Sequence, residues 1–225
     1  MKTALGLLFA LLAALTAMPA GAAPAWTEGR DYVVLPQPQR TNVAPGKVEV
    51  LEVFSYGCPA CNAFQPTMEL LKKGLPPNAQ LAYLPAAFNQ AEDWPMYQRA
   101  WFAAQALGIA ERTHQLMFDA VWKTGELANI DSQTHRLKSP QPTIDQAAQA
   151  YARWTGVKAA DFVAMAKSFT VDGKMRAADE QVMAMQVPGT PCIVVDGRYR
   201  IADSIKAANQ IIPLVSFLVA KASGH

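Results

Sequence analysis

The chain has 225 residues, of which 17% are charged, and a formal net charge of +2. A nearly neutral chain without a basic cluster gives no reason to expect a nucleic-acid partner. Its 3 cysteines are too few for a disulfide scaffold at this length, so they point to chemistry rather than to structural cross-links.

The first residues have the pattern of a secretory signal peptide. Lys2 is followed by an apolar stretch from Ala4 to Leu15 and by small residues before Ala23, and we expect residues 1–22 to be removed. The apolar stretch is shorter than the ~20 residues that a membrane-spanning helix needs. The sequence therefore predicts export into an oxidising compartment, not a membrane anchor.

The first half of the mature chain predicts a strand, a helix and a strand. Residues 31–35 suit a short edge strand, and residues 48–54, rich in apolar and β-branched side chains, suit a central strand. From Pro59 onward apolar residues recur at helical spacing, and Pro66 should kink that helix. Residues 80–88 predict a second core strand, which completes a βαβ unit.

The second half predicts helices and then a hairpin. From about Ala91 to Ala184, alanine-rich amphipathic segments are separated by glycines and prolines, as in an all-helical block. Residues 193–201 read as two short strands around Asp196-Gly197, a strong signal for a two-residue turn. A final helix is expected from near Ser204 to Ala222.

Two cysteines stand where the central strand gives way to the first helix, in the run Cys58-Pro59-Ala60-Cys61. At a helix N-terminus the backbone N–H groups and the helix dipole stabilise a thiolate, and a stabilised thiolate is a good leaving group. A disulfide that leaves easily is suited to transfer to another protein. The run therefore predicts a redox-active pair, with the disulfide as its resting state in an oxidising compartment.

Two other interpretations of the pair stay open. A zinc site needs two more ligands, but there is no second closely spaced cysteine pair, and His114 and His135 lie in the helical block. A purely structural disulfide across two residues closes too small a loop to stabilise much. We favour the redox interpretation and expect no metal and no cofactor other than the disulfide itself.

The run Val187-Pro188-Gly189-Thr190-Pro191 directly precedes the hairpin. A proline at this place can simply mark the start of a strand. The order of strand, dithiol, helix, strand and hairpin, however, resembles the thioredoxin fold, in which a cis-proline at this point faces the active-site disulfide. The run is thus a candidate second half of the site.

The whole mature chain resembles the DsbA family of periplasmic thiol:disulfide oxidoreductases. The segments that carry this resemblance, in family order, are Glu52 to Cys61, Tyr97-Gln98-Arg99-Ala100, Lys123-Thr124-Gly125-Glu126 and Gly189-Thr190-Pro191. The resemblance implies an α/β, thioredoxin-like fold with an inserted all-helical domain. We expect the thioredoxin-like domain at residues 24–90 and 185–225, and the helical insertion domain at residues 91–184.

The resemblance also implies roles for the site residues. Cys58 is expected to be the exposed nucleophile and Cys61 the buried resolving cysteine. Pro191 is expected to be the cis-proline, with Thr190 pairing with the substrate backbone. The implied activity is donation of the disulfide to newly exported, reduced proteins in the periplasm, with reoxidation by a membrane quinone-linked partner. We expect the protein to be a monomer.

The sequence departs from the family pattern next to the second cysteine. Many members carry histidine there and this chain has Ala60, so we predict a less acidic Cys58 and a weaker oxidant than the histidine-bearing type. Thr190 is commoner in reductases and isomerases of this fold, which points the same way. Tyr56, Pro59 and Ala60 are candidates for an uncharged groove that accepts unfolded chains by backbone contacts.

Glu52 is a charged residue in a strand that should be buried. It is either a carboxylate that reaches solvent at a sheet edge or a buried proton acceptor near Cys61, and we favour the proton acceptor. Family members often pair this acid with a lysine on the next strand, but residues 80–83 contain none. Cys192, directly after Pro191, is expected to be a small core cysteine.

Two rival functions remain. One is a disulfide isomerase or reductase of the same fold. Known isomerases of this fold have an extra N-terminal dimerisation module, whereas only about twenty-five mature residues precede the central strand here. The other rival is a peptide-binding chaperone with a purely structural dithiol, whose action on unfolded proteins would persist after Cys58 is replaced by serine.

Overall fold

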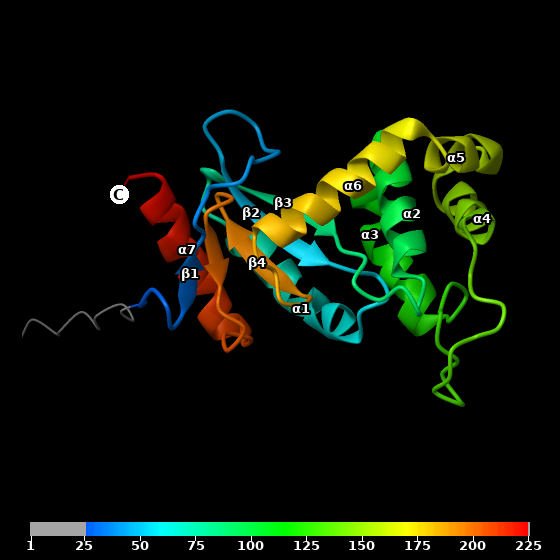
Figure 1. Ribbon diagram of the computed structural model, residues 1–225, viewed down its shortest axis with the longest axis horizontal. Helices are drawn as coiled ribbons and strands as arrows, with labels where there is room; N and C mark the ends of the chain where they lie inside the picture. Colours follow the sequence, from blue (N-terminus) through cyan, green and yellow to red (C-terminus); the bar gives the residue numbers. More distant parts are fainter. Residues whose placement is uncertain (1–25, 225) are drawn as a thin grey trace, which may run out of the picture.

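A five-stranded mixed sheet forms the centre of the protein in the computed structural model, which describes residues 26–224 (Figure 1). The strand order is β1-β5-β4-β2-β3, with β2 and β3 parallel and the other neighbours antiparallel. The strands are β1 (Tyr32–Val34), β2 (Val48–Phe54), β3 (Ala79–Pro85), β4 (Cys192–Val195) and β5 (Tyr199–Ile201). The predicted signal peptide, residues 1–22, lies outside the described residues.

Helix α1 connects β2 to β3, and the long helical stretch connects β3 to β4 (Figure 1). This confirms a thioredoxin-like α/β fold with a helical insertion. The helices are α1 (Pro59–Gly74), α2 (Trp94–Ala106), α3 (Ala110–Phe118), the π-helical turn η1 (Asp119–Lys123), α4 (Ile144–Thr155), α5 (Ala159–Ala166), α6 (Phe169–Ala184) and α7 (Ala208–Ala222). No helix among residues 26–224 is long and apolar enough to cross a membrane.

The local elements follow from their residue types. Every residue of β2 is buried, because the strand has neighbours on both sides in the sheet and a hydrophobic core packs on each of its faces. Asp196 and Gly197 have φ angles of 55° and 58°, the left-handed conformations that a tight hairpin turn requires. A side chain at Gly197 would also collide with the backbone of Gln39, so glycine is required there on both counts.

Two predicted boundaries were wrong. The second core strand ends at Pro85 rather than at residue 88, because its partner β2 ends at Phe54. The last helix begins at Ala208 rather than near Ser204, since Ala207 has an extended backbone with φ −81° and ψ 138°.

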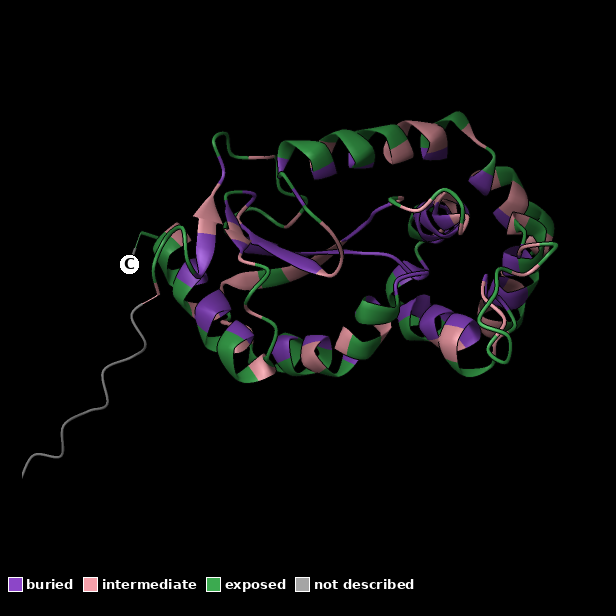
Figure 2. Cartoon of the chain, turned by 60° about the horizontal axis from the view of Figure 1, so that its bottom comes forward, coloured by how far each residue is buried: buried purple, intermediate pink, exposed green. Residues whose placement is uncertain are grey.

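Two hydrophobic cores lie on the two sides of the sheet. On one side, Val48 and Val50 of β2 pack with residues of α1 and α7, among them Met68 and Leu214. Leu51, Val53 and Phe54 of β2 belong to a second core, which continues through the helical block and includes Trp101, Phe118 and Phe162. In Figure 2 the buried residues lie on the inward sides of the helices and along the sheet. The helical block is therefore packed directly onto the sheet that carries the dithiol.

Candidate active site

Cys58 is the residue that caps the N-terminus of α1. Its Sγ accepts a hydrogen bond from the backbone N–H of Cys61 at 3.3 Å. Pro59 follows in the first helical turn, where a missing N–H costs nothing. The N–H of Cys58 donates to the carbonyl of Ser55, and the N–H of Gly57 donates to the Ser55 hydroxyl. The loop before α1 is thus fixed by its own hydrogen bonds.

The loop before β4 lies against this cap. The thiol of Cys58 is within 3.3 Å of the carbonyl oxygen of Thr190, 132 positions away in the sequence. The peptide bond between Thr190 and Pro191 is cis. The fold therefore brings together Cys58, Cys61, Thr190 and Pro191, which the sequence could associate only through a family resemblance.

The two sulfur atoms have opposite acidities. Hydrogen bonds from the Cys61 thiol, the Thr190 side chain and the backbone N–H groups of Cys61 and Ala60 lower the pKa of Cys58 to about 6, against the opposing effect of burial. Burial, together with the neighbouring Cys58 and Glu52, raises the pKa of Cys61 far above its ordinary value. The pair therefore holds a negative charge much more easily on Cys58 than on Cys61.

Cys58 is less accessible than the resemblance implied. Only 4% of the residue is exposed, because the Thr190 loop lies against its sulfur, and Cys61 is fully buried. Cys58, Cys61 and Cys192 are all free thiols. The expectation of an exposed nucleophile is corrected to a sulfur at the edge of the surface, which a partner reaches beside the Thr190 loop.

Glu52 lies on β2, which is paired with β3 on one side and β4 on the other, and it is fully buried, so the edge interpretation of this residue is wrong. Neither carboxylate oxygen has a hydrogen-bond partner. Burial, and secondly the charge of Cys58, raise the pKa of Glu52 to about 8. The residue opposite Glu52 on β3 is Tyr83. A carboxyl group with this pKa holds a proton near neutral pH and can give it up.

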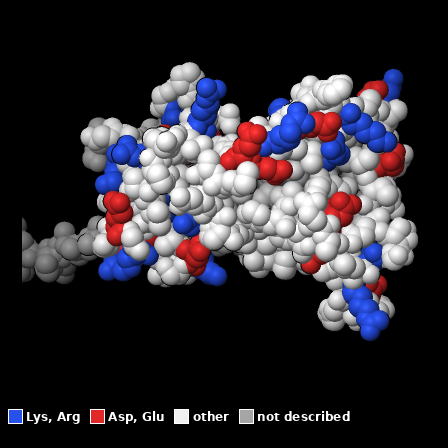
Figure 3. Space-filling view, viewed as in Figure 1, with Lys and Arg blue, Asp and Glu red and all other residues white. Residues whose placement is uncertain are grey.

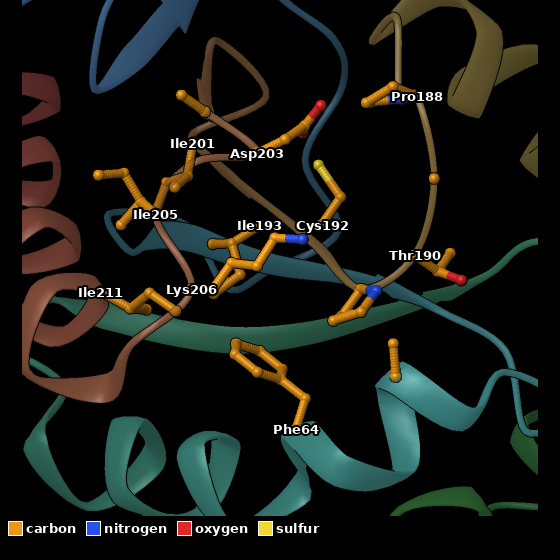
Figure 4. A pocket seen from close by; sticks show the side chains of 14 residues that line it. Phe64, Pro188, Thr190, Cys192, Ile193, Ile201, Asp203, Ile205, Lys206 and Ile211 are labelled. Atoms are coloured by element: carbon orange, nitrogen blue, oxygen red, sulfur yellow. The ribbon is translucent and has the colours of Figure 1, made fainter.

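A largely apolar groove of about 310 Å³ begins beside the dithiol. Figure 4 shows Phe64 from α1, Pro188 and Thr190 from the loop before β4, and Ile205 and Lys206 from the segment after β5 around it. Ala60 and Pro191 also line this groove. Pro59 is exposed next to Ala60 but is not among the lining residues.

Tyr56 does not line the groove, so that expectation is corrected. Its ring is 1% exposed and packs edge-on against Phe54 and Phe118. Its hydroxyl and Nδ1 of His114 are 3.0 Å apart, and the indole N–H of Trp122 donates to the Tyr56 carbonyl at 2.7 Å. Contacts with helices far along the chain turn this ring inward.

Cys192 is buried and stands at the wall of the groove. Burial is the largest of several effects that together raise the pKa of its thiol to about 12, so the thiol is a poor nucleophile. No group of three or more His, Cys, Asp or Glu side chains in residues 26–224 is arranged to hold a metal ion. The geometry leaves Cys58 as the reactive sulfur.

Two residues next to the site were not assigned a role from the sequence. Trp94 packs on the dithiol loop: a Cβ on Gly57 would lie 2.6 Å from its indole nitrogen. His114, considered only as a zinc ligand, is buried within a ring of aromatic side chains. No local pattern marks either contact, since both depend on where α2 and α3 pack.

A polarised dithiol at a helix N-terminus, facing a cis-proline across the edge of a mixed sheet, defines a thiol:disulfide oxidoreductase of the thioredoxin fold. Residues 71–211 match the family model described as the DSBA-like thioredoxin domain. The chain belongs to this family. The matched range begins after Cys58 and Cys61, so the roles of these two residues rest on the geometry above.

Individual relatives agree with this assignment. The chain is 30% identical over 197 residues to the thiol:disulfide interchange protein DsbA of Pseudomonas aeruginosa, covering 87% of this chain and 85% of that protein. The crystal structure of the oxidoreductase DsbA from Xylella fastidiosa superposes with a TM-score of 0.76 at 28% identity, covering 88% of this chain and 98% of that one. A Proteus DsbA variant with a non-covalently bound peptide gives a TM-score of 0.64 at 25% identity, covering 89% and 99%.

Proposed function

We propose that the protein is a dithiol oxidase that donates the Cys58–Cys61 disulfide to reduced proteins. The observation that carries this proposal is the opposite acidity of the two sulfurs, with the pKa of Cys58 lowered to about 6 and that of Cys61 raised. A disulfide whose product is a stabilised thiolate is a strong acceptor of electrons. The direction of transfer is therefore from the substrate dithiol to the enzyme.

The reaction proceeds in two exchanges. A substrate thiolate attacks Sγ of Cys58 in the oxidised pair, a bond forms between these two sulfurs, and Cys61 leaves with the electron pair. Cys61 then takes a proton, as its raised pKa requires. A second substrate thiolate attacks the substrate sulfur, the substrate disulfide forms, and Cys58 leaves as the thiolate that its surroundings stabilise. The substrate is oxidised by two electrons and the enzyme is reduced by two.

The groove beside Cys58 suits an extended, unfolded segment. Its walls are mainly apolar, and the partly exposed backbone of the loop around Thr190 offers main-chain hydrogen bonds that do not depend on the substrate sequence. Figure 3 shows a broad area without charged side chains over the middle of the face that it presents. The peptide bound to the Proteus relative supports the same class of substrate.

We further propose that the protein works as a monomer in the periplasm and is reoxidised by a membrane quinone-linked partner. The predicted signal peptide and the family membership support this location. A reduced Cys58–Cys61 pair must pass two electrons to an acceptor before the enzyme can act again. Reoxidation of the purified, reduced protein by bacterial membranes would support this partner.

The proposed function is tested with the purified protein and a reduced substrate that has two cysteines. We expect one substrate disulfide for each oxidised enzyme, and no oxidation by Cys58→Ser or by Cys61→Ser. The two variants should differ in alkylation: Cys61→Ser keeps a thiol that reacts quickly at neutral pH, whereas Cys58→Ser does not. A Cys58→Ser variant that still prevents aggregation of unfolded proteins as well as the unmodified protein would favour the chaperone, and reshuffling without net oxidation would favour the isomerase.

A further inference from the structure

The dithiol loop contains a peptide unit that is held at both of its ends. The carbonyl oxygen of Tyr56 accepts a hydrogen bond from the indole N–H of Trp122 at 2.7 Å, and the N–H of Gly57 donates to the hydroxyl of Ser55 at 3.2 Å. A peptide unit is planar, so fixing its oxygen and its hydrogen fixes the direction of the whole plane. The backbone N–H of Cys58 then donates to the carbonyl of Ser55 at 3.1 Å. The position of Cys58 therefore depends on the direction of this one peptide unit.

Gly57 gives the loop a backbone that must be held from outside. A glycine has no Cβ, and its backbone adopts many conformations at little cost. The space that a side chain would fill here is taken by Trp94 and Tyr97, whose nearest atoms lie 2.6 Å and 3.1 Å from a Cβ built on Gly57. These two rings confine the glycine by packing, whereas the hydrogen bond that orients the Tyr56 carbonyl comes from Trp122.

Trp122 reaches the loop from a π-helical turn. Helix α3 runs directly into η1, where the N–H of Thr124 donates to the carbonyl of Asp119, five residues back, at 2.8 Å. A π-helical turn has one residue more than an α-helical turn, so its side chains leave the helix in different directions, and such turns are frequent at functional sites. The N–H of Leu127 fixes the end of the turn by donating to the carbonyl of Ala120 at 2.9 Å. The result of this geometry is that the indole N–H points at the dithiol loop.

The same helical segment also holds the side chain of Tyr56. The Tyr56 hydroxyl is 3.0 Å from Nδ1 of His114, and its ring packs edge-on against Phe118 with the ring centres 4.9 Å apart. Trp122 is itself partly buried and packs against the hydrophobic core that joins the helical block to the sheet. Residues 114–122 therefore hold both the side chain and the main chain of one residue, two positions before Cys58.

We propose that Trp122 is a positioning residue for the dithiol: its hydrogen bond to the Tyr56 carbonyl holds the loop in the conformation in which the start of α1 stabilises the Cys58 thiolate. The proposal rests on the proposed function and adds a residue of the helical block on which the oxidising strength depends. Trp122 acts through the backbone of the loop and takes no part in the exchange of electrons between the sulfur atoms.

The place of the Cys58 sulfur connects the loop to the chemistry. Its Sγ is 3.3 Å from the backbone nitrogen of Cys61 and 3.3 Å from the carbonyl oxygen of Thr190. The thiolate is stabilised by hydrogen bonds, with that of the Cys61 thiol as the largest contribution, and hydrogen bonds weaken steeply when their angles change. If the peptide unit before Cys58 turns, the sulfur moves with it and the thiolate loses part of this stabilisation. Because the thiolate is the leaving group of the second exchange, the disulfide then becomes a weaker oxidant.

The test is Trp122→Phe, which keeps an aromatic ring and removes the indole N–H. The thiolate absorbance of the reduced protein gives the pKa of Cys58, and equilibration with glutathione gives the redox equilibrium constant. We expect the pKa of Cys58 to rise by about 0.5 to 1 unit, and the tendency to oxidise glutathione to fall about threefold or more. The matched control is Trp154→Phe, the same change at a partly buried tryptophan of α4 that packs on Tyr151, and it should move neither value.

Two further variants separate the hydrogen bond from a general loss of packing. Ser55→Ala removes the acceptor at the other end of the same peptide unit and should shift both values in the same direction as Trp122→Phe. The two effects should not be additive in the double variant, because both changes act on one peptide unit. Trp122→Gln has no ring but keeps an N–H donor, so its pKa and its redox equilibrium should lie closer to those of the unmodified protein than the values of Trp122→Phe do.

Thermal unfolding of each variant measures the accompanying loss of stability. If Trp122→Phe were less stable but had the same pKa of Cys58 and the same glutathione equilibrium as Trp154→Phe, Trp122 would be a structural residue only and the proposal would be overturned. Should Trp122→Phe not fold, Ser55→Ala decides alone, and unchanged values there overturn the proposal. If the unmodified protein does not oxidise a reduced two-cysteine substrate, the proposed function has failed, whereas the pKa of Cys58 still tests the role of Trp122.

Discussion

Cys58 and Cys61 are only three positions apart in the sequence, but their surroundings differ strongly. Cys58 lies outside the first turn of α1, where backbone N–H groups and the Thr190 loop reach its sulfur. Cys61 is inside that turn and faces the sheet beside Glu52, without exposure to solvent. One helix start thus creates two chemical environments, and the electron transfer takes its direction from the difference.

The two environments also give opposite pH dependences of stability. The pKa of Cys58 in the folded, reduced protein is lowered from 9.0 to about 6, so folding is favoured increasingly as pH rises from about 6 to about 9. The pKa of Glu52 in the folded protein is raised from 4.5 to about 8, so folding is favoured less and less as pH rises from about 4.5 to about 8. The oxidised protein has no Cys58 thiolate and should show only the second trend.

Replacing Glu52, which lies beside Cys61, by glutamine should produce the largest change in the free energy of unfolding. At pH 7 an unfolded chain has lost the proton of Glu52 while the folded protein keeps it, which costs about 3 kcal/mol of stability at about 1.4 kcal/mol per pH unit. Glu52→Gln should recover this free energy and remove the decline between pH 4.5 and pH 8. Denaturant unfolding of the oxidised protein across that range measures both effects.

The matched control for this variant is Glu180→Gln, which neutralises an exposed carboxylate on α6. We expect its stability to follow that of the unmodified protein within about 0.5 kcal/mol at every pH. If the stability of Glu52→Gln declined with rising pH as that of the unmodified protein does, the carboxyl group of Glu52 would not be the cause of this pH dependence.

Replacing Gly57 by alanine tests how the helical block supports the Cys58 side. A Cβ at this position would lie 2.6 Å from the indole nitrogen and 2.8 Å from Cδ1 of Trp94, so the loop or the indole must move. Such overpacking costs about 1–3 kcal/mol, and the thiolate of Cys58 should lose part of its stabilisation because the loop shifts. Thermal unfolding and a thiolate titration measure the two consequences.

Gly173→Ala is the control for this change. A Cβ there meets only the end of the Arg176 side chain at 3.9 Å, and alanine favours a helix interior, so a gain of about 0.5–1 kcal/mol is expected. A Gly57→Ala protein as stable as the unmodified one, with an unchanged Cys58 titration, would show that Trp94 does not fix the loop.

Much of the fold was predictable because short-range physics decides it. The residues of β2 form an apolar, β-branched run of strand length, and the turn at Asp196-Gly197 uses residues that accept positive φ, so both elements lie where the sequence predicted them. The start of α7 was not predictable in the same way. The apolar spacing of that helix does not reveal that Ala207 is extended.

The sequence predicted most of the residues that form the site, but not how far their side chains are exposed to solvent. The cysteine spacing and the helix start identify Cys58 and Cys61, whereas the contact between Cys58 and Thr190 joins segments that no local pattern relates. Tyr56 was placed in the groove because it is close to the dithiol in sequence, yet Phe118 and His114 from α3 decide where its ring points. Such long-range contacts depend on helix packing that a single sequence does not specify.

The smallest effect is expected from adding a histidine next to Cys61. Ala60 is exposed, so an imidazole at this position has room beside the Cys58 sulfur. Its positive charge and its N–H group should lower the pKa of Cys58 further, by about one unit, and make the disulfide more oxidising by about 30 mV per tenfold change in the exchange equilibrium. Titration of the thiolate absorbance and equilibration with glutathione measure the two values for Ala60→His.

Ala60→Gln has an uncharged side chain of similar length and should move neither value by more than a small fraction of this shift. If both variants changed the pKa equally, the contrast between the two cysteines would depend on hydrogen bonding at position 60 and not on charge.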